Sequence, residues 1–352
     1  MANVAVIGSG AWGTTLARLV ALEQVRQAQA QGAISGQPVA DVTLWEHRPE
    51  RAQAIQWERE NRTYLPGFPL PANLHVTANL ADAVRNRDVA LLVVPSQRMR
   101  ENARALAPLL AQGTTVVSAS KGLELGTHLR MTEVAAQELP AGVPVAALSG
   151  PNLAPEIARG LPAAAVIACA DEAAAERARA ALSTPRFRLY TSDDVIGIEL
   201  GGALKNIVAI AIGISDGLQY GDNAKASLMT RALTEISRLA LAAEAHPLTL
   251  AGLAGLGDLI ATCSSPLSRN RTLGLELAKG RALDEVLGER RSVAEGVTTT
   301  RAALEMAAAL GVELPITAEL ARVLFEGKPV REAVAALMER DPKREREGLE
   351  EG

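Results

Sequence analysis

The chain has 352 residues but only two cysteines, Cys169 and Cys263, and aromatic residues make up 3% of it. Two cysteines are too few for a disulfide framework and fit a reducing compartment, so we expect each to be a small core residue. No basic segment precedes the first apolar run, so we expect no secretory signal peptide and a cytoplasmic location. With so few aromatic residues, the core must be built from Ala, Val, Leu and Ile.

An excess of positive charge is also missing. The formal net charge is −4, which argues against nucleic acid as the main partner. The four histidines have no metal-ligand spacing, and the sequence contains no G-x-S-x-G, P-loop or CxxC motif. We therefore expect no metal. His128 is a rival proton carrier, but we discount it because it falls in an expected exposed turn.

The remaining composition is that of an ordinary globular protein, with 48% hydrophobic and 22% charged residues. Single cores stop growing near ~250–300 residues, so the chain should hold two domains. We place a nucleotide-binding domain at residues 1–191 and a helical domain at 192–338. The tail at 339–352 carries ten charged residues in fourteen and is expected to be frayed or disordered.

The first distinctive feature is the apolar run Val4–Ile7, which leads directly into the G-x-G-x-x-G spacing of Gly8, Gly10 and Gly13. This order predicts a buried strand that turns sharply into a helix. Gly8 would permit the turn, Gly10 would let a pyrophosphate approach the backbone, and Gly13 would let helix and strand pack closely. We interpret the loop as a dinucleotide site; the alternative is a structural turn without a ligand.

Further apolar runs predict a doubly wound parallel sheet of the Rossmann type. The expected strands are 42–45, 88–94, 114–120, 143–148, 163–170 and 187–190, with a helix at 171–183 before the last strand. Ligands of such sheets bind at the carboxyl ends of the strands. Lys121, Gly150 and Asn152 follow strand ends and are therefore candidate site residues.

The strand at 42–45 is followed by Glu46, His47 and Arg48. A carboxylate there would accept a hydrogen bond from a ribose 2′-OH and favour NAD, whereas His47 and Arg48 would hold a 2′-phosphate and favour NADP. Both cofactors stay open, with a preference for NADPH because two donors flank one acid; the three residues could also merely cap a solvated strand end. The segment 24–39 is interpreted as a helix extension plus a solvated loop.

From residue 195 onward the patterns predict long helices, at 195–215, 225–245, 272–279, 300–309 and 316–325, so the second domain should be all-helical. The first is apolar but carries Glu199 and Lys205 near its centre, which argues against a membrane span. Gly201 and Gly202 share the helical face of Lys205 and should leave a hollow beside its ammonium. Desolvation would lower the pKa of Lys205 toward the range of a general acid–base. A snorkelling or salt-bridged lysine is the alternative.

A second polar cluster contains Asp258 in an expected Gly-rich turn, followed by Ser268, Arg269 and Asn270 before a helix. Ser268 is a plausible N-cap. Arg269 and Asn270 beside a helix N-terminus would form an anion site suited to a phosphorylated substrate, or they are simply solvent-exposed. Asp258 either caps a helix or accepts a hydrogen bond from a substrate hydroxyl.

Seven motifs occur in order along the chain: GSGAWGT at 8–14, SKGLE at 120–124, SGPN at 149–152, LGGALKN at 200–206, GLGDL at 255–259, SRN at 268–270 and AEG at 294–296. In this pattern the chain resembles bacterial NAD(P)-dependent sn-glycerol-3-phosphate dehydrogenases over about residues 3–338. The sequence departs from the family pattern at Asn152, where Ser or Thr is usual, and at Glu46, where a small residue is usual.

The resemblance implies reversible reduction of dihydroxyacetone phosphate to sn-glycerol 3-phosphate for phospholipid synthesis, with Lys205 as the proton carrier. It implies the following substrate contacts: Lys121, Gly150, Asn152, Lys205, Asp258, Ser268, Arg269 and Asn270. It implies that these residues line the cofactor, beside the glycine loop: Trp12, His47, Arg48, Lys121, Ala154, Arg269, Val293 and Glu295. A homodimer is possible. The alternatives are another β-hydroxyacid dehydrogenase of the same two-domain build and a non-catalytic dinucleotide-sensing protein.

Overall fold

The computed structural model describes residues 1–32, 40–289 and 294–341. It divides into two compact units, one formed by Met1–Ser120 with Met131–Val195 and the other by Lys121–Arg130 with Ile196–Gly352. The loop expected within 24–39, Val293 and most of the charged tail lie wholly or partly outside the described residues. The helical part of the 24–39 segment is present, because the first helix runs to Ala30.

The first unit contains one eight-stranded sheet in the order β3-β2-β1-β4-β5-β6-β7-β8. Neighbouring strands are parallel except for β6 and β7. The strands are β1 (Val4–Ile7), β2 (Val42–Trp45), β3 (Leu74–Thr77), β4 (Val89–Leu92), β5 (Thr115–Ser118), β6 (Val145–Ser149), β7 (Ala163–Ala168) and β8 (Phe187–Ser192). The doubly wound architecture is as predicted; no range had been given for β3. The chain reverses its order between β1 and β4, the position where such sheets bind nucleotides.

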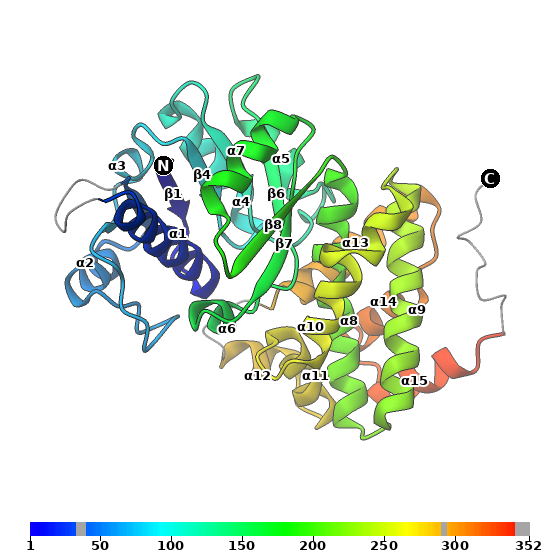
Figure 1. The fold of residues 1–352 in the computed structure, drawn as a ribbon. Helices are drawn as coiled ribbons and strands as arrows, with labels where there is room; N and C mark the ends of the chain where they lie inside the picture. The colour runs from blue at the N-terminus through cyan, green and yellow to red at the C-terminus, as the bar shows by residue number, and fades with distance from the viewer. Residues whose placement is uncertain (33–39, 290–293, 342–352) are drawn as a thin grey trace. The chain divides into compact units, whose positions relative to one another are not determined.

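In the described part of this unit, α-helices flank the sheet: α1 (Ala11–Ala30), α2 (Pro49–Glu58), α3 (Leu80–Val84), α4 (Met99–Leu106), α5 (Met131–Glu138), α6 (Ala154–Ala158) and α7 (Glu172–Leu182). Figure 1 shows α1 lying along β1, and α1 also contacts β2, α6 and α7. Helices α4 and α5 pack against each other and contact β4 and β6 respectively. The core is aliphatic, as expected from the low aromatic content, with Phe187 as its one buried phenylalanine among the described residues.

The second unit is helical. It contains α8 (Val195–Gly217), α9 (Gly221–Ala242), α10 (Asp258–Ser264), α11 (Arg269–Ala278), α12 (Leu283–Gly288), α13 (Glu295–Leu310), α14 (Pro315–Phe325) and α15 (Val330–Met338). Helices α10, α12 and α15 had not been predicted, and α11 and α13 begin three and five residues before their predicted starts at 272 and 300. A π-helical segment, Leu253–Gly257, leads into α10. Asp258 therefore opens a helix; the Gly-rich turn expected around it is wrong.

Helix α8 forms the centre of the second unit's core. Its length and composition would allow it to cross a membrane, and so would those of Pro247–Ser264, but 83% of the apolar window of α8 is buried inside the protein. Leu200, Leu204 and Ile207 pack with residues of α9, α11, α13 and α14. The apolar run thus has a structural partner on most of its surface, as the core helix of a globular protein does.

The segment Lys121–Arg130 belongs to the second unit, although it directly follows strand β5 of the first. Leu123 is fully buried in the helical core and forms an antiparallel bridge with Arg130. Arg130 Nη1 lies 2.8 Å from Glu199 Oε2 on α8. This differs from the sequence-based boundary, which gave all of 1–191 to one domain, because a charge pair between distant residues has no local sequence signal.

Candidate active site

The glycine loop after β1 has the geometry of an anion-binding turn. Gly8 has φ +117°, and a Cβ there would lie 2.3 Å from the carbonyl oxygen of Val93. A Cβ on Gly13 would lie 1.9 Å from the carbonyl oxygen of Gly8, whereas a Cβ on Gly10 would meet nothing within 4 Å. Gly10 is the N-cap of α1, with no side-chain cap and no acidic residue in the first turn. The first N–H groups of α1 are therefore available to a phosphate.

Ser9 is fixed within this loop by three side chains. Its carbonyl oxygen accepts hydrogen bonds from Asn61 Nδ2 at 2.7 Å and Thr14 Oγ1 at 3.0 Å. Its hydroxyl donates to the carboxylate of Glu46. Asn61 and Glu46 are almost fully buried, with 1% and 2% of their surface exposed. The sequence reading missed Asn61, which has no motif of its own and meets Ser9 only in the folded chain.

At the end of β2, His47 and Arg48 are exposed and Glu46 is not. Arg48 Nε donates a hydrogen bond to His47 Nε2 at 3.2 Å. The backbone N–H of Arg48 donates to Glu46 Oε1 at 3.0 Å. The donors predicted for a 2′-phosphate thus face outward, while the predicted ribose acceptor faces inward.

The other candidate residues of the first unit follow β1 and β6. Trp12 packs edge-on against Phe187, with ring centroids 6.0 Å apart, and its indole Nε1 is buried without a hydrogen-bond partner among the described residues. Both amide atoms of Asn152 are also buried and unpaired within the described part of the chain. Buried polar atoms without a protein partner call for a ligand or water.

Close packing also explains the glycine at position 150, since a Cβ on Gly150 would lie 2.8 Å from Ala165 Cα. Ala154 opens α6 and is buried.

In the second unit, two lysines meet one carboxylate. Lys205 Nζ donates to Asp258 Oδ1 at 2.5 Å and to Thr262 Oγ1 at 2.6 Å, while Lys121 Nζ donates to Asp258 Oδ2 at 2.6 Å. Lys205 is 7% exposed and Asp258 is 1% exposed. Thr262 had not been singled out, although its position four residues after Asp258 places it on the same helical face.

Burial lowers the pKa of Lys205 to about 8, because desolvation disfavours the ammonium. The carboxylate of Asp258 opposes this shift, and the charge of Lys121 adds to it. An amine with a pKa near neutrality exchanges protons in both directions at physiological pH, which suits a general acid–base. Lys205 is salt-bridged, as the alternative predicted, and it is also strongly desolvated; its role as a general acid–base stays a prediction.

The hollow predicted beside Lys205 is not present at Gly201. A Cβ on Gly201 would lie 2.8 Å from the carbonyl oxygen of Ala254, so the backbone of the π-helical segment Leu253–Gly257 fills that space. Gly201 instead permits the close backbone approach that brings the start of α10, and with it Asp258, to Lys205. Gly201 is thus required beside Lys205, but for the close packing of two helical segments and not for a hollow.

Around the start of α11 the predicted N-cap is confirmed, since Ser268 Oγ accepts from the backbone N–H of Arg271 at 3.3 Å. Arg269 is exposed at the first position of the helix. Desolvation of its guanidinium by neighbouring groups lowers the pKa of Arg269, and the charge of Glu295 opposes this shift. A cation at a helix N-terminus forms an anion site with directed donors.

Asn270 has a structural role that the sequence did not indicate. Its Nδ2 donates to Asn206 Oδ1 at 2.9 Å, and its Oδ1 accepts from the backbone N–H of Gly296 at 3.1 Å. The buried amide thereby joins α8, α11 and the start of α13. The second N–H of the Asn270 amide has no acceptor among the described residues.

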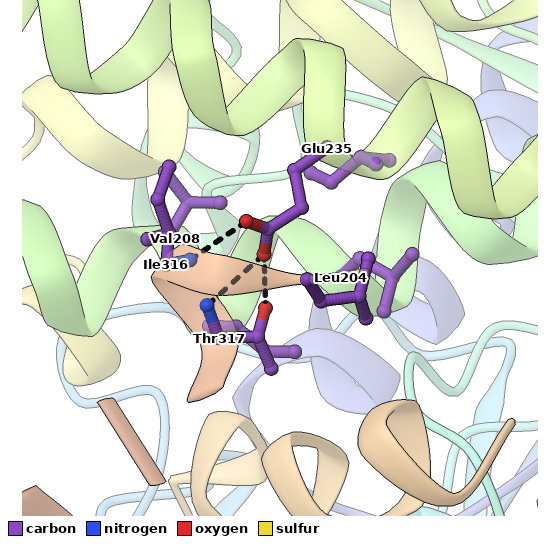
Figure 2. A pocket seen from close by; sticks show the side chains of 8 residues that line it. Leu204, Val208, Glu235, Ile316 and Thr317 are labelled. Carbon is purple, nitrogen blue, oxygen red and sulfur yellow. Dashed lines mark hydrogen bonds between the residues drawn. The ribbon is translucent and has the colours of Figure 1, made fainter. Parts of the chain in front are cut away.

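A small cavity of the second unit lies in the helical core and carries no lysine or arginine in its lining (Figure 2). Leu204 and Val208 of α8 line it together with Glu235 of α9. Glu235 accepts hydrogen bonds from the backbone N–H groups of Ile316 and Thr317, at 2.7 and 3.0 Å, and from the Thr317 hydroxyl. Burial raises the pKa of Glu235. Its carboxylate caps the N-terminus of α14, so we assign it to stability and not to catalysis. In the described part of the chain, no three His, Cys, Asp or Glu side chains are grouped to hold a metal ion.

Comparisons with known proteins show what the chain is similar to. Residues 3–175 match the family described as NAD-dependent glycerol-3-phosphate dehydrogenase N-terminus, and residues 194–335 match its C-terminus. The chain is 49% identical over 351 residues to a glycerol-3-phosphate dehydrogenase [NAD(P)+] of Thermobifida fusca, covering 99% of this chain and 100% of the relative. It is 48% identical to the enzyme of the same name from Geobacter metallireducens, covering 98% and 99% of the two chains. A crystal structure of glycerol-3-phosphate dehydrogenase from Coxiella burnetii superposes with a TM-score of 0.88 at 38% identity, covering 96% of this chain and 99% of that one.

Proposed function

The chain belongs to the NAD-dependent glycerol-3-phosphate dehydrogenase family, and from that premise we propose that it interconverts dihydroxyacetone phosphate and sn-glycerol 3-phosphate with NAD(P)H as the reductant. The observation that carries the proposal is the buried amine of Lys205, which is held by Asp258 and Thr262 and has a pKa of about 8. A sensor of dinucleotides has no use for such a proton carrier.

The dinucleotide fits the residues of the first unit. Gly10 leaves open space where a side chain would otherwise lie, and α1 begins there without a cap. The reduced nicotinamide, when bound, supplies a hydride to the C2 carbonyl carbon of the substrate. The other predicted cofactor contacts stay predictions: Trp12, His47, Arg48, Lys121, Ala154, Arg269 and Glu295. Val293 lies outside the described residues.

Lys205 gives a proton to the substrate oxygen at C2 as negative charge develops there, and takes it back in the oxidation direction. Asp258 holds the ammonium in place and is itself held by Lys121. Two ammonium groups around one carboxylate leave a net positive charge, which favours an oxygen anion. Gly150 and Asn152 stay predicted substrate contacts.

Arg269 and the N-terminus of α11, with Ser268 and the remaining N–H of Asn270, bind the phosphate. This supplies binding energy away from the reacting bond and orients C2. We further propose that the enzyme works in the cytoplasm, feeds glycerophospholipid synthesis and forms a homodimer. Sedimentation of the purified protein tests the dimer.

The activity is tested by following the absorbance of the reduced nicotinamide with dihydroxyacetone phosphate and each cofactor in turn. We expect oxidation of NADPH and NADH that depends on the substrate. No oxidation with either cofactor, together with turnover of a hydroxy acid without phosphate, would favour another dehydrogenase of the same build.

Arg269→Ala tests the phosphate site. The KM for dihydroxyacetone phosphate should rise about tenfold or more, the scale of a lost charge-assisted hydrogen bond. With the cofactor at saturation, the kcat/KM for dihydroxyacetone, which lacks the phosphate, should stay unchanged and serves as the matched control. Equal losses with both substrates would remove Arg269 from the phosphate site.

A further inference from the structure

We propose that Glu46 is a positioning residue that holds the glycine loop through Ser9, and that it does not bind the ribose of the cofactor. Its place directly after β2 is where an acidic residue of a dinucleotide fold usually accepts from the ribose 2′-OH. The inference rests on the proposed function in taking a nicotinamide dinucleotide as the ligand of this loop.

Each oxygen of the Glu46 carboxylate accepts one hydrogen bond from the protein and has a second nitrogen nearby. Its Oε2 accepts from the Ser9 hydroxyl and lies 3.5 Å from Arg51 Nη2. Its Oε1 accepts from the backbone N–H of Arg48 and lies 3.0 Å from His47 Nδ1. Two of the roughly four lone-pair directions of the carboxylate thus accept hydrogen bonds within the protein, and two side-chain nitrogens lie close to the same oxygens, so the carboxylate is directed toward the protein.

Burial leads to the same conclusion, because Glu46 is 2% exposed. A carboxylate that accepts a hydrogen bond from a ribose hydroxyl must expose at least one oxygen to the ligand. The imidazole of His47, by contrast, is 62% exposed. The ligand therefore meets the side chains of His47 and Arg48 at this strand end, with the exposed Glu50 as the opposing charge in the first turn of α2.

What Glu46 does hold is the residue between the first two glycines. The Ser9 carbonyl is fixed by Asn61 and Thr14, and its hydroxyl is fixed by Glu46. The loop is thereby ordered before a ligand arrives, which reduces the entropy lost on binding. Because NADH and NADPH share the same pyrophosphate, an ordered loop benefits both cofactors equally.

The test compares dissociation constants of NADH and NADPH, measured by calorimetry without substrate, for the wild type, Glu46→Ala, Ser9→Ala and the double variant. Glu46→Ala should weaken both cofactors by about tenfold, the scale of one buried charge-assisted hydrogen bond. The ratio of the two dissociation constants should change by less than about twofold. The double variant should bind no more weakly than Glu46→Ala, because each single substitution already removes the same Ser9–Glu46 hydrogen bond. Loss of NADH binding alone, or additive losses in the double variant, would overturn the proposal.

Thr43→Val is the matched control. It removes another buried hydrogen bond of β2, from Thr43 Oγ1 to the carbonyl oxygen of Ala83 at 2.6 Å, without touching the loop. It should lower the melting temperature and leave both dissociation constants unchanged. If Glu46→Ala fails to fold, Glu46→Gln replaces it and should give a smaller loss at the same unchanged ratio. A wild type that binds both cofactors but does not reduce dihydroxyacetone phosphate would refute the proposed function, while the binding ratios would still decide the role of Glu46.

Discussion

The candidate sites of the two units consist of different chemical groups. In the first unit, the groups expected to bind the ligand are backbone N–H donors at the start of α1, which Gly8, Gly10 and Gly13 make accessible. In the second, they are charged side chains, with Lys205 and Lys121 around Asp258. Backbone donors are the same in every residue, so the first site depends on shape. The pKa of a charged side chain changes with burial, so the proton transfer expected at the second site depends on the groups that surround Lys205.

The sharpest way to separate the two sites is Lys205→Ala. We expect kcat to fall by about 10²–10⁴-fold, the usual contribution of a general acid–base. The dissociation constant of NADPH should stay within about twofold, since a site made by the first unit's backbone does not need this amine. Calorimetry and steady-state kinetics on the same preparation decide the point. Retained turnover would remove Lys205 from the mechanism.

Glu235→Ala shows whether every buried charge of the second unit belongs to its chemistry. The substitution leaves the N–H groups of Ile316 and Thr317 without an acceptor, at about 1–3 kcal/mol for each unsatisfied buried group. We expect the free energy of unfolding to fall by about 3 kcal/mol, measured by denaturant titration, with kcat unchanged. Glu326→Ala, an exposed residue at the other end of α14, is the control and should change neither. A fall in kcat without a loss of stability would contradict the assignment.

Within the first unit, Gly10→Ala and Gly13→Ala separate ligand access from folding. A methyl group on Gly10 enters open space, so stability should be unchanged, whereas cofactor binding should weaken about tenfold or more as the pyrophosphate loses its close contact. A methyl group on Gly13 meets the carbonyl oxygen of Gly8 at 1.9 Å, so this variant should lose stability as well. Melting curves and cofactor titrations of both variants test this. Unchanged cofactor binding by Gly10→Ala would show that Gly10 is not a ligand position.

The pH dependence of the activity measures the pKa of Lys205 in the second site. With the pKa of Lys205 at about 8, glycerol 3-phosphate oxidation should increase as the pH rises through that value, because the neutral amine accepts the proton. Dihydroxyacetone phosphate reduction should decrease over the same range. Lys121→Met removes a positive charge that lowers this pKa, so the midpoint should move to higher pH. Profiles of kcat for both directions test this, with Thr43→Val as the control; an unmoved midpoint would contradict the coupling.

Much of the fold could be predicted because its signals are local. The apolar runs located most of the strands, and Ser268 was identified as an N-cap from its position before a helix. The ion pair of Arg130 with Glu199, which ties the segment Lys121–Arg130 to α8 of the helical unit, joins residues with no shared pattern. Helices α10 and α15 were missed because short amphipathic segments give weak periodicity.

The candidate site was predictable to the extent that a residue's type determines its role. Glycine spacing indicated the dinucleotide loop, and a lysine in an apolar helix indicated a reactive amine. Thr262 and Asn61 were missed, because a hydroxyl or an amide becomes functional only through the neighbour it meets. The amide of Asn270 was assigned to the ligand alone, yet it joins three helices.

By itself, the sequence determined where the backbone turns, which runs are buried and which family the chain resembles, because these follow from spacing along the chain. Only the tertiary structure decided what the charged residues do. Asp258 reaches Lys205 because the Leu253–Gly257 backbone packs against Gly201, and Glu46 turns inward because Ser9 lies opposite it. Solvation and pKa depend on which groups surround a charge in space, and those groups come from distant parts of the chain.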